Sequence, residues 1–174
     1  MKLREYQSDF IKYWENVLPY GVMLWDRQSG KTSSAIYEVC RLSIATKNLN
    51  SFMYFHGPLL AYAKGDIVKI FRDIGQSHLI KQENAQLIRL TNGSNIRLFN
   101  LRSEKTLAGN NVDIIYIDEF DFMKDNVFEE FLMYSALKPH VKVILSSSNY
   151  NNRKMKILRE YKGYNEYFIH RHTT

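Results

Sequence analysis

The sequence has 174 residues, of which 45% are hydrophobic and 24% charged, which is ordinary for one globular domain with a substantial core. The longest apolar runs have only strand length, so we expect no membrane-spanning helix, and charges come too early in the chain for a secretory signal. The net charge of +6 is compatible with a nucleic-acid partner, although many soluble domains carry as much. The single cysteine, Cys40, falls in an apolar helical pattern, so we expect a buried thiol in a reducing compartment.

The first elements lead into a polar loop. Residues 3–16 have a helical pattern with one apolar face, made of Leu3, Tyr6, Phe10, Ile11 and Trp14. Pro19-Tyr20-Gly21 ends this helix, and the apolar run that follows, up to Trp25, predicts the first strand. Between this strand and a helical segment from Ser33 to about Thr46 lies the loop Asp26-Arg27-Gln28-Ser29-Gly30-Lys31-Thr32-Ser33.

A tight loop between a strand and a helix is the context that a phosphate-binding loop needs. Its backbone N–H groups and the positive end of the following helix attract phosphate oxygens. Lys31 would reach the β- and γ-phosphates of a nucleotide, and the Thr32 hydroxyl would ligate Mg²⁺. The general pattern G-x-x-x-x-G-K-[ST] begins with a glycine where this sequence has Trp25, so the loop alone indicates a nucleotide site but does not establish it.

The rest of the chain alternates between strand and helix patterns. Strands are expected at 51–56, 112–117 and 141–145, and helices at 59–74, 126–137 (with Asn126 as N-cap) and 152–161. Alternating residues at 86–91 and 94–100 around Asn92-Gly93 predict a β-hairpin. This order predicts a single α/β domain over 1–174, with a mainly parallel central sheet sandwiched by helices and a β-hairpin insertion near 86–100.

Polar residues follow two of the buried strands. Asp118 and Glu119 come directly after Ile117, and Ser146-Ser147-Ser148-Asn149 follows Leu145. Ligands bind at the carboxyl ends of parallel strands, so both segments should meet the phosphate loop there. Nucleotide hydrolysis needs one carboxylate for Mg²⁺ and another to orient and deprotonate water, and we assign these roles to Asp118 and Glu119. The serine segment can sense the γ-phosphate or the catalytic water, or it can be an ordinary polar turn.

Taken together, these motifs resemble those of viral large terminase subunits, the ATPases that drive genome packaging in tailed bacteriophages and herpesviruses. That family typically lacks the first glycine of the phosphate loop and carries Arg-Gln before x-Gly-Lys-[Ser/Thr], as in Arg27-Gln28 here. The other matching segments are Leu3-Arg4-Glu5-Tyr6-Gln7, which resembles the family's upstream glutamine motif, then Asn92 to Ile96, Gly109-Asn110, Ile114 to Phe120, and Ser146 to Asn149.

The resemblance implies a P-loop NTPase fold of the additional-strand, catalytic-glutamate type, acting on ATP with Mg²⁺. It implies that Gln7 contacts the adenine and that Arg27 is a cis-acting arginine finger, which joins Lys31 and Glu119 as a catalytic residue. Nucleotide contacts would come from Gln7 and from Arg27, Gln28, Ser29, Gly30, Lys31, Thr32 and Ser33; Thr32 and Asp118 would hold the metal. Ser146, Ser147, Ser148 and Asn149 would couple hydrolysis to movement.

The same resemblance implies the partners. They are double-stranded DNA, a portal protein, a small terminase subunit and further copies of the chain in a ring. The expected location is the host-cell cytoplasm, transiently at the procapsid portal, without a membrane.

Two positions depart from the family pattern. Many members have an arginine, proposed to act on a neighbouring subunit's nucleotide, where this sequence has Ala108; Arg102 or Lys105 would have to replace it. Asp121 adds an acid close behind the expected catalytic pair, either as a solvated turn residue or as a like charge that perturbs Glu119.

The C-terminal third lacks the clustered acids of a two-metal nuclease, so we expect a motor domain without a nuclease domain. Residues 153–171 are rich in basic and aromatic side chains, which is typical either of a DNA-tracking surface or of the solvated face of a terminal helix. Two other functions remain open. One is a helicase-like DNA-dependent ATPase, and the other is a nucleotide-binding module with little turnover.

Overall fold

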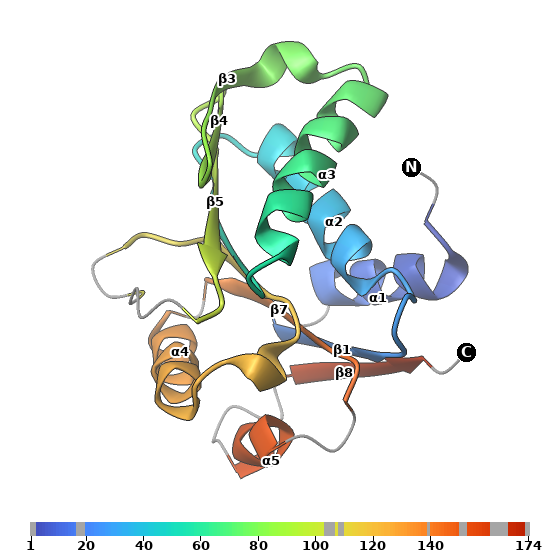
Figure 1. Ribbon diagram of the computed structural model, residues 1–174, viewed down its shortest axis with the longest axis vertical. Coiled ribbons are helices and arrows are strands. Elements are labelled where there is room, and N and C mark those ends of the chain that lie inside the picture. The colour runs from blue at the N-terminus through green and yellow to red at the C-terminus, as the bar shows by residue number, and fades with distance from the viewer. Residues whose placement is uncertain are drawn as a thin grey trace.

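The computed structural model describes residues 3–16, 20–102, 107, 110–138, 140–149, 153–160 and 167–172. An eight-stranded sheet runs through the molecule in the order β3-β4-β5-β2-β6-β7-β1-β8 (Figure 1). In that order the strands are β3 (Ile80–Glu83), β4 (Leu87–Leu90), β5 (Asn95–Asn100), β2 (Asn50–Phe55), β6 (Ile114–Ile117), β7 (Lys142–Ser147), β1 (Tyr20–Trp25) and β8 (Tyr167–His172).

The six strands from β5 to β8 pair in parallel, which confirms the expected parallel sheet. β7 lies between β1, which leads into the polar loop, and β6, which ends before the acidic pair. This intervening strand is the additional strand of the predicted P-loop NTPase fold. Its carboxyl end therefore places the serine segment between the loop and the acids.

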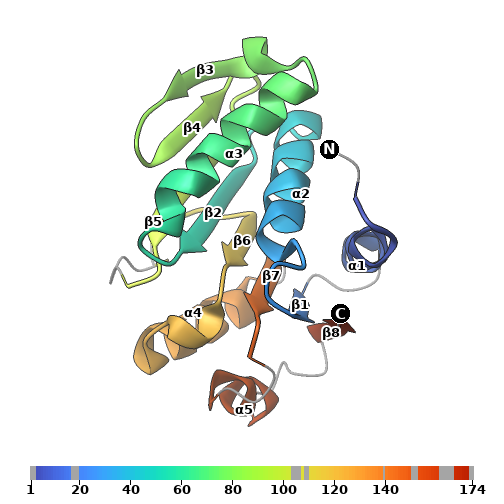
Figure 2. The same ribbon diagram turned by 45° about the vertical axis from the view of Figure 1, so that its right-hand side comes forward.

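Helices cover both faces of the sheet (Figure 2). α1 (Glu5–Asn16), α2 (Lys31–Ala45) and α3 (Leu59–Asp73) pack on one face, and α4 (Asp125–Leu137) and α5 (Arg153–Glu160) on the other. Successive residues of β1 alternate between the two cores: Met23 and Trp25 join the first, and Val22 and Leu24 the second. The strand is buried on both faces, which explains its continuous apolar sequence.

The predicted hairpin is present but extends the main sheet rather than standing apart as an insertion. β4 and β5 pair antiparallel across Asn92-Gly93, while β5 also pairs in parallel with β2. The Asn92 amide donates hydrogen bonds to the carbonyls of Ser43, Ile44 and Thr46, so the hairpin turn caps the C-terminal end of α2.

Several expectations need correction. The helix after the loop begins at Lys31, not Ser33, and α4 has Lys124 rather than Asn126 at its N-cap. β3, the short 3₁₀ helix η1 (Ser77–Leu79) and β8 were not predicted as elements. Short or mixed-polarity edge strands give weak sequence patterns because packing on only one side decides them. Within the described residues, no helix is long and apolar enough to cross a membrane.

Candidate active site

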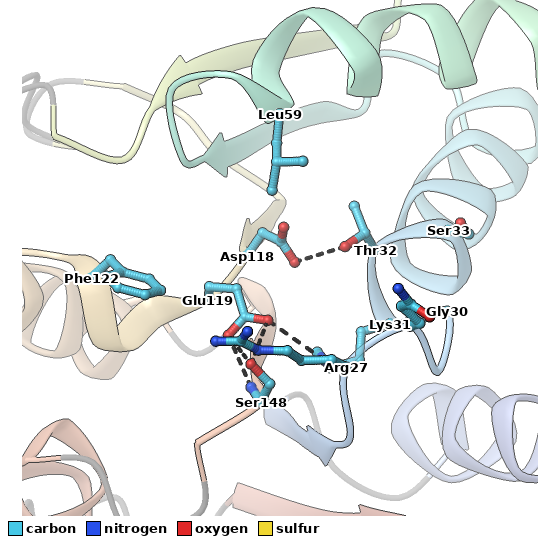
Figure 3. Close-up of a pocket in the computed structure, with 11 residues that line it drawn as sticks. Arg27, Gly30, Lys31, Thr32, Ser33, Leu59, Asp118, Glu119, Phe122 and Ser148 are labelled. Atoms are coloured by element: carbon cyan, nitrogen blue, oxygen red, sulfur yellow. Dashed lines mark hydrogen bonds and ion pairs between the residues drawn. The ribbon is translucent and has the colours of Figure 1, made fainter. Parts of the chain in front are cut away.

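A pocket of about 480 Å³ opens at the carboxyl ends of β1 and β6 (Figure 3). The phosphate loop, the acidic pair and the serine segment all contribute to its wall. The lining residues are Arg27, Gln28, Gly30, Lys31, Thr32, Ser33, Leu59, Asp118, Glu119, Phe122 and Ser148. A pocket of this volume suits a small-molecule ligand. Leu59 and Phe122 have no motif in the sequence that would have identified them as pocket residues.

The phosphate loop is built from unusual backbone conformations. Gln28 has φ 60° and Gly30 has φ 85°, both in the left-handed region, and α2 begins directly after Gly30. The N–H groups of the first turn of a helix lack helical partners, so those at the start of α2 can bind anionic oxygens. Gly30 is also crowded, because a Cβ at this position would lie 2.5 Å from Nε2 of Gln7.

α1 holds the loop from behind. The Tyr6 hydroxyl donates a 2.5 Å hydrogen bond to the carbonyl of Ser29. The Gln7 amide donates to the carbonyls of Ser29, at 3.2 Å, and Gly30, at 3.4 Å. Gln7 is buried and lies outside the pocket lining, so the contact expected between Gln7 and adenine stays a prediction. Ser29 is buried as well and lies behind the pocket wall.

Lys31 links the loop to the acidic pair. Its buried ammonium donates hydrogen bonds of 3.0 Å to the carbonyls of Trp25 and Asp26 and lies 3.6 Å from Oε1 of Glu119. The Trp25 side chain is fully buried in the first core, and its indole N–H donates to Nδ1 of His170 on β8. The residue that replaces the usual glycine therefore adds its side chain to the core while its carbonyl serves the loop.

Asp118 accepts several hydrogen bonds on one oxygen. Hydroxyls of Thr32, at 3.0 Å, Ser146, at 2.8 Å, and Tyr116 all donate to Oδ1. Oδ2 is buried and has no protein partner among the described residues. Burial raises the pKa of this carboxyl group, although the three hydroxyl donors oppose the shift.

The residues fit a magnesium ion. The buried, unpaired Oδ2 of Asp118 and the adjacent Thr32 hydroxyl are the oxygen donors that Mg²⁺ prefers. In the part of the chain that the structure describes, no group of three or more His, Cys, Asp or Glu side chains gathers to hold a metal. One carboxylate plus substrate phosphates and water is the usual environment of a nucleotide-bound Mg²⁺.

Glu119 is held in a strained position next to the pocket. Its φ of 48° is in the left-handed region, which is uncommon for a residue with a side chain. The N–H of Ser148 donates to Oε2 at 2.9 Å, and the Ser148 hydroxyl lies 3.0 Å from each carboxylate oxygen. The carboxylate thus faces the loop and is fixed by the serine segment, as Figure 3 shows.

The four residues of the serine segment have different positions. Ser148 lines the pocket, Ser146 and Ser147 are buried beneath it, and Asn149 is exposed. Sequence reasoning missed Tyr116, whose hydroxyl bonds Asp118 and lies 3.1 Å from that of Ser146. The signal was available, since a polar group two residues before Asp118 in a strand shares its face.

Arg27 lines the pocket with an exposed side chain. Asp121 is half-buried rather than fully solvated, and its carboxylate accepts a hydrogen bond from Ser147. Nearby Glu119 contributes to the raised pKa of Asp121, but burial is the larger cause. Ala108, Gly109, Lys105 and much of the basic segment 153–171 lie outside the described residues; Arg102 is exposed.

Solved structures with this fold include phage large terminases. The Thermus phage P74-26 large terminase ATPase domain superposes with a TM-score of 0.77 at 13% identity, covering 98% of this chain and 80% of that one. A large terminase from another thermophilic bacteriophage, in complex with ATP-γ-S, gives a TM-score of 0.67 at 13% identity, over 98% of this chain and 44% of that one. The present chain thus corresponds to less than half of that second terminase.

A hypothetical ATP-dependent RNA helicase from Sulfolobus tokodaii is less similar. Its TM-score is 0.60 at 16% identity, over 98% of this chain and 53% of that one. At these identities the likeness concerns the fold alone.

Sequence comparison identifies the family. No curated protein matches the chain. Residues 23–132 match the model of the N-terminal region of the terminase large subunit, T4likevirus-type. That match spans the phosphate loop, the acidic pair and most of the sheet. The chain therefore belongs to the terminase large subunit family, of which it represents the N-terminal, ATPase-domain part.

Proposed function

We propose that the chain binds ATP with Mg²⁺ and hydrolyses it to drive double-stranded DNA into a viral capsid. The observation that carries this proposal is the convergence of Lys31, Thr32, Asp118 and Glu119 on one pocket. Family membership supports a packaging role, and the complex of a thermophilic phage's large terminase with ATP-γ-S supports a nucleotide as the ligand.

The residues divide the chemistry among them. Lys31 and Arg27 stabilise negative charge on the transferred phosphoryl group, and Arg27 acts in cis from the loop itself. Thr32 and Asp118 hold Mg²⁺, which neutralises charge on the phosphate oxygens when bound. Glu119 orients and deprotonates the attacking water, for which its carboxylate must face the γ-phosphate end of the pocket.

The remaining loop residues bind the nucleotide. The N–H groups of Gln28, Ser29, Gly30 and Ser33 surround the phosphates, and Gln7 contacts the adenine from α1. Ser146, Ser147, Ser148 and Asn149 couple hydrolysis to movement, since their segment bonds both Asp118 and Glu119.

The proposed setting follows the family. The chain is a single motor domain without a nuclease, assembled in a ring with a portal protein and a small terminase subunit around double-stranded DNA. It works in the cytoplasm of the host cell, transiently at the procapsid portal.

The test is ATP turnover by the full chain with no DNA, with duplex DNA and with single-stranded DNA. We expect Mg²⁺-dependent turnover that duplex DNA stimulates most. Turnover stimulated mainly by single strands favours the helicase-like ATPase, for which the fold likeness to the Sulfolobus tokodaii protein is the specific observation. Tight nucleotide binding without turnover under any of the three conditions favours the nucleotide-binding module.

A further inference from the structure

Three consecutive serines pair one-to-one with three acids of the loop after β6. The pairs are Ser146 with Asp118, at 2.8 Å, Ser148 with Glu119, at 3.0 Å, and Ser147 with Asp121, at 2.9 Å. The proposed mechanism uses the first two acids and leaves Asp121 without a role. The third pair anchors the chain two residues beyond Glu119.

The backbone carbonyl of Asp121 has a partner from a different element. Lys154, on α5, donates a 3.0 Å hydrogen bond from Nζ to this carbonyl and a 3.1 Å bond to Oδ1 of Asp125. The Lys154 side chain is only 7% exposed, so its charge depends on these two acceptors. Met155 and Leu158 of α5 pack in the same core as Phe120 and Phe128, which keeps α5 against this segment.

The left-handed backbone of Glu119 needs support from both sides. Glu119 is the N-cap of the 3₁₀ helix η2 (Phe120–Phe122), and its carbonyl accepts the N–H of Phe122 at 3.0 Å. A conformation with φ 48° persists only where the surrounding contacts determine it. Ser148 fixes the carboxylate of Glu119, whereas Ser147 and Lys154 fix the turn that sets its backbone.

We propose that Asp121 and Lys154 are positioning residues for Glu119, and that they tie the location of α5 to the hydrolytic carboxylate. This inference rests on the proposed hydrolytic function of Glu119. Lys154 acts through the carbonyl of Asp121 and Asp121 acts through Ser147, so neither touches the substrate. Displacement of α5 by a partner shifts Glu119 by this route.

The test removes the buried ammonium with Lys154→Met, which keeps the length and apolar packing of the side chain. We expect kcat for ATP to fall by about ten-fold, because small misplacements of a catalytic group have effects of this size, while the nucleotide Kd stays within about two-fold. The matched control is Arg153→Met, since Arg153 pairs with the same Asp125 at 2.9 Å from an 80% exposed side chain. Its kcat should stay within about two-fold of the wild type.

A second pair of variants separates position from charge. Asn at position 121 can still accept the Ser147 hydrogen bond, so Asp121→Asn should keep most of the kcat that Asp121→Leu loses. The inference is overturned if Lys154→Met retains full kcat, if Arg153→Met loses as much, or if Asp121→Asn falls as far as Asp121→Leu.

A measurement without turnover keeps this inference separate from the proposed function. In wild-type chain the Ser148 N–H bonds Glu119, and the Asn149 N–H bonds the Ser147 hydroxyl at 2.9 Å. Lys154→Met should accelerate hydrogen exchange of these two amides by about ten-fold while the amides of β1 keep their rates. Equal acceleration throughout the sheet indicates general destabilisation and overturns the positioning role, whether or not the wild type hydrolyses ATP.

Discussion

The phosphate loop and the acidic loop lie opposite each other in the same pocket, but they are held in different ways. Side chains from α1 bond the carbonyls of the phosphate loop at Ser29 and Gly30. The acidic loop is held by hydroxyls that bond the carboxylates of Asp118, Glu119 and Asp121. The first arrangement fixes a backbone and the second fixes side chains.

The difference follows from what each loop has to present. A phosphate site needs free backbone N–H groups, so only the carbonyls can be used to fix the loop. A metal ligand and a general base need oriented carboxylates, and short hydroxyl side chains orient them at close range. Variants of the two loops should therefore fail in different quantities, nucleotide affinity for the first and kcat for the second.

The largest effect is expected for Glu119→Gln. The amide keeps the size of the side chain and can still accept hydrogen bonds from Ser148, but it cannot take a proton from water. We expect kcat to fall by about 10³-fold with nucleotide affinity nearly unchanged, measured by steady-state turnover and by binding of a fluorescent ATP analogue. Turnover near the wild-type value would show that Glu119 is not the base.

Gly30→Ala should weaken the phosphate loop. The φ of 85° strains any L side chain, and the new Cβ would lie 2.5 Å from Nε2 of Gln7. We expect the Kd for ATP to rise by about ten-fold or more, from a backbone penalty of about 1–2 kcal/mol. Adding Gln7→Ala relieves the clash but not the strain, so the double variant should recover only part of the affinity. Full recovery would mean that crowding alone limits this position.

Ser148→Ala tests the acidic loop without removing an acid. The Ser148 N–H still bonds Glu119, but the hydroxyl that lies 3.0 Å from both carboxylate oxygens is lost. We expect a fall in kcat of about ten-fold, in line with the roughly 1.5–3 kcal/mol typical of hydrogen bonds to charged groups. Ser148→Thr, which keeps a hydroxyl, is the control. A change in nucleotide Kd with constant kcat would contradict the division between the two loops.

Gln7→Ala distinguishes two roles for one side chain. If Gln7 mainly braces the loop through Ser29 and Gly30, the Kd values of ATP and GTP should rise equally, by about five-fold for one lost hydrogen bond of about 1 kcal/mol. If it reads adenine, the loss should be confined to ATP. Isothermal titration with both nucleotides decides between these outcomes.

Cys40 should show the smallest effect. It lies on α2 behind the loop, it is fully buried, and burial raises the pKa of its thiol well above the ordinary value. A raised pKa lowers the thiolate fraction at every pH below it, so a maleimide at about pH 8 should label native protein far more slowly than unfolded protein. The loop variants should leave this rate unchanged. Faster labelling in Gly30→Ala would show that its defect spreads beyond the loop into α2.

Much of the fold could be predicted from the sequence because its strands are buried on both faces. Continuous apolar runs such as that ending at Trp25 exclude other assignments, and the Asn92-Gly93 turn identified the hairpin. The edge strands β3 and β8 could not be found in this way, since one side of each lacks a neighbouring strand. The start of α2 was placed two residues late because the left-handed Gly30 ends the loop without a side-chain cap.

The sequence by itself determined which chemical groups this protein has at its strand ends, because a strand, a loop and a helix in succession leave few choices for Lys31, Thr32, Asp118 and Glu119. Only the tertiary structure decided which group meets which. The order in which β7 enters the sheet brings Ser146, Ser147 and Ser148 to three separate acids, and the packing of α5 brings Lys154 to the carbonyl of Asp121. Such pairings join residues about 30 positions apart, and they depend on strand order and helix packing, which no local pattern encodes.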